Sequence, residues 1–175
     1  MEIVGYHTCK KTNDVLEKAP FLSGCSDRIW LTQEYYFWTD DIYHAHKWGK
    51  SSIEGNYSIV KCLINLDEEK DELLDLVGNI SQQIYFDALI KKFMKEFKDE
   101  NITIRAVIMF LRNKALKNSE IFPFIAIKAK DEYNEERYSF IDYGSAKIRL
   151  LERHQLCVFE EGRSKISSPD LEFES

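Results

Sequence analysis

The order of strand-like and helix-like patterns along the chain is the feature that most limits its fold. Apolar residues recur at helical spacing within residues 82–98, at Ile84, Phe86, Leu89, Ile90, Phe93, Met94 and Phe97. Both ends of the chain are instead rich in β-branched and aromatic residues. Strands at the two ends with helices between them predict an α+β fold. The 175 residues suit one domain, which we expect to span residues 1–166 and to be followed by a disordered tail at 167–175.

Local patterns predict the other elements. Strands are expected at residues 2–6, 29–31, 35–38, 57–66, 122–129, 138–141 and 155–159. Helices are expected from Thr12 or Asn13 to Lys18, and from Asp40 or Asp41 to about Lys50. The second helix would bury Ala45 and Trp48, which lie three residues apart. Residues 73–76 fit a short strand or a turn, 102–116 fit a strand or a helix, and 131–137 indicate a charged hairpin tip.

Charge and cysteine usage restrict the class of protein. The net charge of -6 predicts a mildly acidic surface without the basic stripe typical of nucleic-acid binding, although charge can still gather on one face. The four cysteines form no CxxC pair, so we expect no metal, and free thiols fit a reducing cytoplasm. The first residues lack a basic segment and a long apolar run, so we expect neither a signal peptide nor a membrane span.

Three segments far apart in the sequence each place one candidate side chain on an expected strand. Residues 5–8 carry His7, residues 35–40 carry Tyr36, and residues 154–159 carry Gln155. A His, a Tyr and a Gln or Glu in this order resemble the nicotinamide-binding site of the His-Tyr-Glu branch of ADP-ribosyltransferases, which includes poly(ADP-ribose) polymerases and diphtheria toxin. The layout is most similar to small bacterial toxin-type domains that read Tyr-His-Gly-Thr, Tyr-Phe-Trp and Gln-Ile-Cys-Val at these places.

The resemblance implies an ADP-ribosyltransferase-like split β-sheet with flanking helices, and NAD as co-substrate without a metal. It implies that His7 binds the adenine-side ribose, that Tyr36 stacks on nicotinamide, and that Gln155 contacts the nicotinamide-side ribose. Thr8 and Ala45 would also contact NAD. Cleavage of the nicotinamide–ribose bond passes through an oxocarbenium-like transition state, so a catalyst must fix the ring and the ribose and stabilise positive charge.

Two residues depart from the family pattern. Thr8 stands where the family has a glycine that meets the carboxamide of nicotinamide. Gln155 stands where the family has a glutamate, and its amide binds a hydroxyl but brings no negative charge. The second departure favours a single ADP-ribose transfer or slow catalysis. Glu152, Glu160 and Glu161 are nearby carboxylates that could supply the missing charge.

The expected function is therefore mono-ADP-ribosyl transfer from NAD to a macromolecular acceptor, either protein or nucleic acid. By analogy the chain would be the cytoplasmic toxin of a toxin–antitoxin or phage-defence system, with an antitoxin as a possible partner. The alternatives are an NAD glycohydrolase, or a catalytically silent NAD-binding or interaction module. Acceptor choice would lie in loops such as 131–137 and the stretch before His154.

Each candidate also has a structural interpretation. His7 fits a buried strand histidine, Gln155 fits a polar edge-strand residue, and Tyr35 and Tyr36 point to opposite faces of one strand, so that one belongs to the core. His44 and His46 are expected on the surface. Four lysines of the 82–98 helix fit a solvated face as well as a surface for RNA, namely Lys91, Lys92, Lys95 and Lys98. Arg105 and Arg112 remain open as phosphate ligands.

Overall fold

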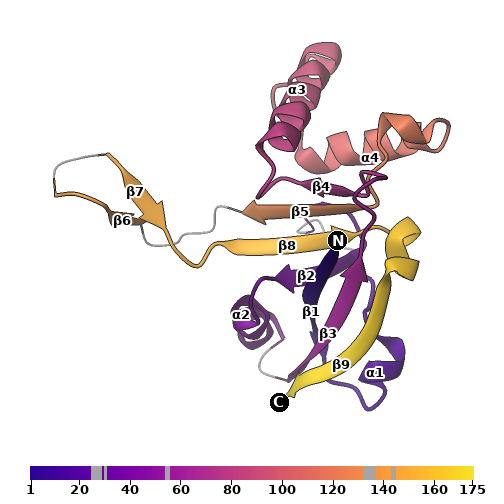
Figure 1. Ribbon diagram of the computed structural model, residues 1–175, viewed down its shortest axis with the longest axis vertical. Helices are drawn as coiled ribbons and strands as arrows, with labels where there is room; N and C mark the ends of the chain where they lie inside the picture. Colours follow the sequence, from indigo (N-terminus) through magenta and orange to yellow (C-terminus); the bar gives the residue numbers. More distant parts are fainter. Residues whose placement is uncertain (25–28, 30, 54–55, 132–136, 143–144) are drawn as a thin grey trace.

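A computed structural model describes residues 1–24, 29, 31–53, 56–131, 137–142 and 145–175 (Figure 1). As expected, the fold is α+β: a large mixed sheet carries several helices. The strands of the large sheet are β1 (Glu2–Lys10), β2 (Tyr35–Thr39), β3 (Tyr57–Asn65), β4 (Leu73–Asp75), β5 (Ala126–Asp131), β8 (Arg153–Val158) and β9 (Ile166–Glu174). Their order is β4-β5-β8-β2-β1-β3-β9, and only β4 and β5 run parallel.

The sheet opens between two of its central strands. β1 pairs with β3 along all nine of its residues, from Glu2 opposite Asn65 to Lys10 opposite Tyr57. With β2 it pairs only at Gly5 opposite Thr39 and Tyr6 opposite Trp38. Beyond Tyr6 the two strands separate, although β1 stays in register with β3. This opening places the candidate site.

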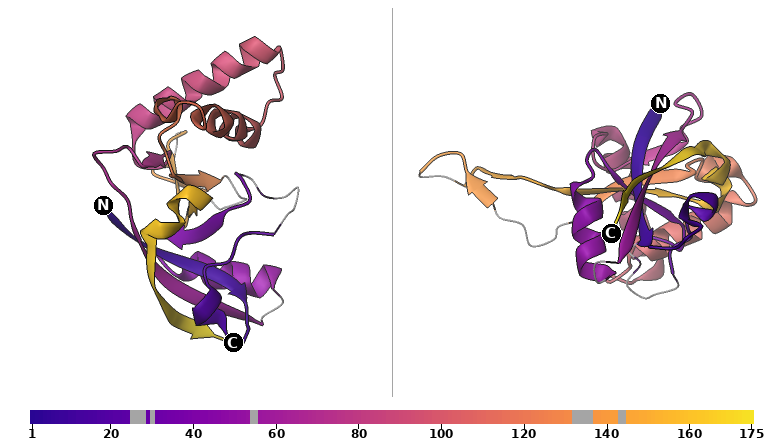
Figure 2. Two further views of the ribbon diagram at one scale, coloured as in Figure 1. Left: turned by 90° about the vertical axis from the view of Figure 1, so that its right-hand side faces the viewer. Right: turned by 90° about the horizontal axis from the view of Figure 1, so that it is seen from below.

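The helices cover both faces of the sheet. They are α1 (Val15–Lys18), α2 (Tyr43–Ser52), α3 (Ile80–Phe97) and α4 (Ile104–Ala115), with 3-10 turns at Ser119–Ile121 and Glu160–Lys165. α1 packs its Val15 with Phe37 and Val60 on one face. On the other face α2 packs against β2 and β3, and the α3–α4 pair packs against β4, β5 and β8 (Figures 1 and 2). No helix in the described part of the chain is both long and apolar enough to cross a membrane.

α2 lies so close to β3 that only glycine fits at residue 49. The ring of Tyr57 lies against Gly49. Tyr57 is only 2% exposed, and its hydroxyl is 2.9 Å from Nδ1 of His46. A methyl group at residue 49 would overlap this ring. We therefore expect Gly49→Ala to lower the free energy of unfolding by about 1–3 kcal/mol, even though alanine is the better helix former.

Urea denaturation of Gly49→Ala beside the exposed α2 control Lys50→Ala tests this expectation. Lys50→Ala should stay within about 0.5 kcal/mol of the unmodified chain, as is usual for surface substitutions. Equal stability of both variants would show that α2 can move away from β3 without a loss of unfolding free energy.

The C-terminal residues form a strand, contrary to the prediction of a disordered tail at 167–175. β9 pairs with β3 from Ile166 opposite Ile64 to Glu174 opposite Ser58, with two register shifts. Phe173 packs on the cluster around Tyr57. The local sequence is polar and contains Pro169, so the signal is weak. The strand is stabilised by the backbone groups of β3, which would otherwise form an open sheet edge.

Other boundaries also differ from expectation. β1 continues through His7 to Lys10, and neither Ile29 nor Leu31 is in a strand. Leu31 is instead buried in the core beneath α4, and Trp30 lies outside the described residues. Residues 104–115 form a helix, which settles the ambiguity of 102–116. Most of the predicted hairpin tip, residues 132–136, lies outside the described residues, and β6 (Arg137–Ser139) replaces the strand expected at 138–141.

Candidate functional site

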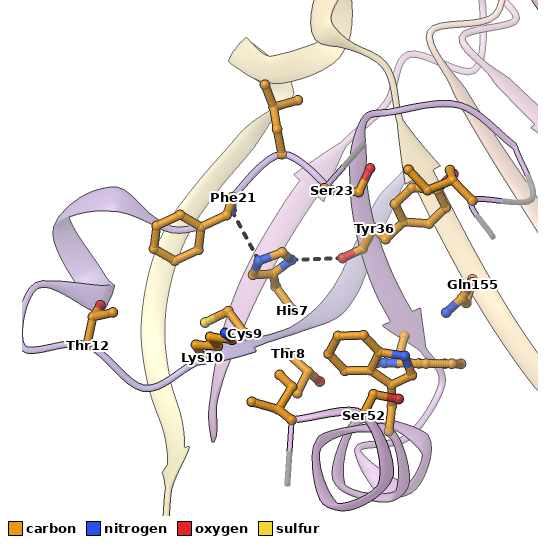
Figure 3. Close-up of a pocket in the computed structure, with 16 residues that line it drawn as sticks. His7, Thr8, Cys9, Lys10, Thr12, Phe21, Ser23, Tyr36, Ser52 and Gln155 are labelled. Carbon is orange, nitrogen blue, oxygen red and sulfur yellow. Dashed lines mark hydrogen bonds between the residues drawn. The ribbon is translucent and has the colours of Figure 1, made fainter. Parts of the chain in front are cut away.

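A pocket of about 750 Å³ lies where β1 and β2 separate (Figure 3). β1 contributes residues 7–10, β2 contributes Tyr36 and Trp38, and β8 contributes Gln155. The C-terminal part of α2 and the segment 21–24 line other walls. The three predicted residues His7, Tyr36 and Gln155 therefore line one pocket, although they are up to 148 positions apart in the sequence.

His7 bridges the opening of the sheet through both of its ring nitrogens. Nδ1 is 3.0 Å from the carbonyl oxygen of Tyr36, and Nε2 is 3.1 Å from the backbone nitrogen of Phe21. Because a carbonyl only accepts and a backbone N–H only donates, the ring is the neutral tautomer that carries its proton on Nδ1. Burial lowers the pKa of His7 to about 4, and the ring therefore stays neutral at physiological pH.

The bonds of His7 fix the walls of the pocket. They join β1 to β2 and hold Phe21, which belongs to the segment that covers one side of the pocket (Figure 3). The same segment is held further along, where Ser23 and Glu34 exchange two hydrogen bonds of 2.9 and 3.0 Å. To bind a ribose hydroxyl, the imidazole of His7 must give up one of its backbone partners. In this structure His7 positions the pocket rather than presenting a ring nitrogen to it.

Tyr36 presents its ring to the pocket while its hydroxyl is anchored. The hydroxyl donates to the carbonyl of Thr32 at 2.6 Å and accepts the Thr32 N–H at 3.0 Å. Burial raises the pKa of Tyr36 far above its ordinary value, so it does not act as an ionised base. Tyr35 points to the other face and is buried in the core, as expected for one of these two tyrosines.

The strand register places a tryptophan and Gln155 beside the ring of Tyr36. Trp38 lies opposite Gln155 in the β2–β8 ladder, and Tyr36 lies opposite Cys157. Residues directly opposite each other share a face, as do alternate residues of one strand, so Tyr36, Trp38 and Gln155 face the same side. Trp38 was not among the predicted ligands, although its alternation with Tyr36 was visible in the sequence. The buried thiol of Cys157 lies under this site, and burial raises its pKa to about 12.

Thr8 and Ala45, the other two predicted ligands, connect β1 to α2. The hydroxyl of Thr8 donates to the Ala45 carbonyl at 3.2 Å, so this side chain is bonded to the helix. Thr8 still lines the pocket. Ala45 is fully buried on the inner face of α2 and is not among the lining residues. Trp48, which we expected to be buried, is 39% exposed and lines the pocket. The helix therefore turns a different face to the pocket from the one predicted.

Among its described lining residues, the pocket has one lysine and no carboxylate. The lysine is Lys10, which is exposed at the C-terminal end of β1. The three candidate carboxylates are engaged elsewhere, and Glu160 is hydrogen-bonded to the side chain of Tyr35. Glu152 pairs with Lys130 at 2.8 Å, and Glu161 pairs with Arg112 at 2.7 Å. The pocket thus suits an anionic ligand and supplies no carboxylate to a positive centre.

Several other polar residues have structural positions. His44 is buried, contrary to its expected place on the surface. Its Nε2 is 3.0 Å from the carbonyl oxygen of Leu151, and its ring is tilted against that of Trp38 with the centroids 5.8 Å apart. Arg112 binds Glu34 at 2.5 Å and lies 4.0 Å above the ring of Phe159, so it is not available to a phosphate. Among the described residues, no group of three or more His, Cys, Asp or Glu could hold a metal ion.

The chain matches no protein-family model, and comparisons with curated proteins and with solved structures find no significant match. The three short segments that resemble the ADP-ribosyltransferase pattern all contribute residues to the pocket described above.

Proposed function

We propose that the chain binds NAD in this pocket and transfers its ADP-ribose to a macromolecular acceptor. The observation that carries the proposal is the convergence of His7, Tyr36 and Gln155 on one pocket at the opening of the sheet. Its volume of about 750 Å³ lies within the usual range for small-molecule sites. The opening between β1 and β2 also supports a split-sheet fold of the ADP-ribosyltransferase kind.

Each residue then has a defined task. Tyr36, held by Thr32, offers a fixed aromatic face for nicotinamide, with Trp38 beside it. The amide of Gln155 binds a hydroxyl of the adjoining ribose. Lys10, at the C-terminal end of β1, attracts the pyrophosphate. His7 keeps the walls in place, and the site accelerates cleavage mainly by holding the two parts of NAD in a fixed orientation.

The missing carboxylate limits the chemistry. A positive charge develops on the nicotinamide-side ribose as the glycosidic bond breaks, and a nearby carboxylate would stabilise it. Gln155 offers only a neutral dipole, and the described lining residues include no carboxylate. We therefore expect slow turnover and the transfer of one ADP-ribose, without chain elongation.

Label transfer from NAD with a tagged adenylate tests the proposal. Purified protein is incubated with the tagged NAD and a cell lysate, and parallel samples are digested with protease, RNase or DNase. A labelled product that one digestion removes, and that Tyr36→Ala does not form, supports the transferase and identifies the acceptor class. Consumption of NAD without a labelled product would instead indicate a glycohydrolase.

Gln155→Glu is expected to increase cleavage of NAD by about tenfold, because the new carboxylate stabilises the positive charge that Gln155 cannot. Release of nicotinamide, measured with and without acceptor, gives both the rate and the ratio of hydrolysis to transfer. Gln155→Ala is the matched control and should lower both reactions. If Gln155→Glu changes neither the rate nor the ratio, another residue occupies the third position.

A second candidate is a module that binds NAD without turning it over. It is favoured by the two backbone bonds that occupy the ring of His7 and by the lack of a lining carboxylate among the described residues. Titration calorimetry separates the two candidates: heat of NAD binding that Tyr36→Ala abolishes, without release of nicotinamide in any lysate, would support the silent module.

A further inference from the structure

A two-stranded arm projects from the body of the protein. It consists of β6 (Arg137–Ser139), β7 (Lys147–Arg149) and the described residues between them, and it extends away from the ends of β5 and β8 (Figures 1 and 2). β6 and β7 form a sheet of their own. An isolated two-stranded ribbon is at best marginally stable in water, and it gains stability when another layer packs on it. The two faces of the arm differ in what such a layer would contact.

One face of the arm is cationic and is turned toward the body. Arg137 lies opposite Arg149, and Ser139 lies opposite Lys147, so these residues share a face. The three cations line a cavity of about 420 Å³, whose other described lining residues are Lys130, Ser145, Ile148 and Glu152. Because Lys130 belongs to β5, the cationic face looks back toward the large sheet.

The other face of the arm is apolar. Tyr138 lies opposite Ile148 on this face. The N–H of Phe140 donates to the carbonyl of Ala146 at 3.2 Å, so the ladder continues by one pair and Phe140 shares the face of Tyr138. Leu150 follows Ile148 by two residues and extends the same face. We call these five residues the apolar face of the arm.

The apolar face is open to solvent. Phe140 is 65% exposed, Leu150 52%, Tyr138 50% and Ile148 39%. With about 200 Å² for a fully exposed side chain of this size, these fractions amount to roughly 400 Å² of exposed apolar surface. This area is within the range of the largest apolar patch on a typical monomer, and such a patch is often a site of interaction.

The chemistry of the apolar face fits a second copy of the chain. Its five residues carry no charge at physiological pH, so the face complements another apolar face rather than an acidic or basic partner. A two-fold rotation packs the apolar face of one arm on the same face of another. Each arm then supplies the layer that the other lacks, and both cationic faces remain outside the contact.

The area of the face is that of a dimer contact. A standard interface buries about 800 Å² on each partner, of which a little more than half is apolar, so it needs about 450 Å² of apolar surface from each side. The roughly 400 Å² of the apolar face is close to this value. Because the arm projects from the body, two chains that each carry a net charge of -6 can meet without bringing their bodies into contact.

We propose that two copies of the chain form a symmetric dimer through the apolar faces of their arms. Analytical ultracentrifugation of the full chain over about 1–200 µM tests this proposal. The mass should rise from one chain to two, with a Kd in the micromolar range, about 1–100 µM. Raising the salt from about 0.05 to 0.5 M should change Kd by less than about twofold, because no ion pair lies in the contact. A chain that stays monomeric, or a dimer that salt dissociates, overturns the proposal.

Phe140→Glu and Ser139→Glu locate the contact. The two positions are adjacent and exposed, and they receive the same charge, but they lie on opposite faces of the arm. Phe140→Glu should raise Kd by at least about 100-fold, because each copy then places a carboxylate in an apolar contact. Ser139→Glu should change Kd by less than about fivefold, as is usual for an exposed charge. Equal effects would mean that dimerisation follows net charge, and no effect of either would place the contact elsewhere. Both results overturn the proposal.

Cross-linking tests the same contact if Phe140→Glu unfolds the arm, which circular dichroism would show. Ile148→Cys and Lys147→Cys place single thiols on the apolar and cationic faces, in a Cys25→Ser background in which the other three cysteines are buried. A bifunctional maleimide of roughly 10 Å, the distance between two packed sheets, should join copies through residue 148 and not through residue 147. Equal yields from the two thiols contradict the proposal. None of these measurements involves NAD, so their outcome is independent of the proposed function.

Discussion

Tyr36→Ala is expected to lower NAD turnover by about 100-fold, because it removes an aromatic face of the pocket that the structure fixes at both ends. The backbone of β2 holds the ring at one end, and two hydrogen bonds from the hydroxyl to Thr32 hold it at the other. Misplacement of a substrate by about 1 Å is sufficient for a rate loss of this size. The measurement is release of nicotinamide at several NAD concentrations, so that binding and rate are separated.

Two conservative variants show which part of Tyr36 matters. Tyr36→Phe keeps the ring but leaves the N–H and carbonyl of Thr32 without this partner, so it should lower stability by about 1–3 kcal/mol and turnover by less than Tyr36→Ala. Tyr35→Phe changes the neighbouring ring, which lies in the core on the other face, and should leave turnover unchanged. If Tyr36→Ala turns over NAD normally in a folded protein, nicotinamide does not stack on this ring.

The elements with strong periodicity were predictable from the sequence. The helical spacing of residues 82–98 corresponds to α3, and the alternation in 35–38 correctly separates Tyr35 from Tyr36. β9 was missed because nothing in its polar sequence indicates a strand; it forms on the edge that β3 provides. The extension of β1 beyond His7 has the same cause, since β3 remains in register with it after β2 has separated. Pairing of distant strands decided both cases.

The candidate site was likewise only partly predictable from the sequence. His7, Tyr36 and Gln155 could be named from three local segments, and the pocket brings them together. The place of Trp38 beside Gln155 depends on the register of β2 with β8, which no local pattern encodes. Both backbone bonds of His7 depend on distant segments as well. The residue types were therefore visible in the sequence, whereas the structure was needed to show that Tyr36 lines the pocket with its hydroxyl anchored and that both ring nitrogens of His7 are bonded to backbone.

The stability of the protein is expected to fall by up to about 3 kcal/mol as the pH drops from about 6.5 to 4, because of His7 alone. Burial lowers the pKa of His7 from 6.5 to about 4 in the folded chain, so between these values the unfolded chain binds a proton that the folded chain does not. The stabilisation is therefore fully present above pH 6.5 and is lost as the pH falls through this window. Protonation of Nε2 also removes its ability to accept the N–H of Phe21.

His7→Gln isolates this contribution. Glutamine can donate to the Tyr36 carbonyl and accept the Phe21 N–H, but it does not titrate, so its curve of unfolding free energy against pH should be flatter than that of the unmodified chain over pH 4–6.5. Urea denaturation at closely spaced pH values gives both curves. The carboxylates and the other histidines are the same in the two proteins, so their contributions to the pH dependence cancel when one curve is subtracted from the other. NAD binding should weaken in the same window for the unmodified chain only, because release of Phe21 opens one wall of the pocket. Parallel curves would mean that the pKa of His7 is the same in the folded and unfolded chain. That result would contradict the buried, doubly bonded ring on which its positioning role depends.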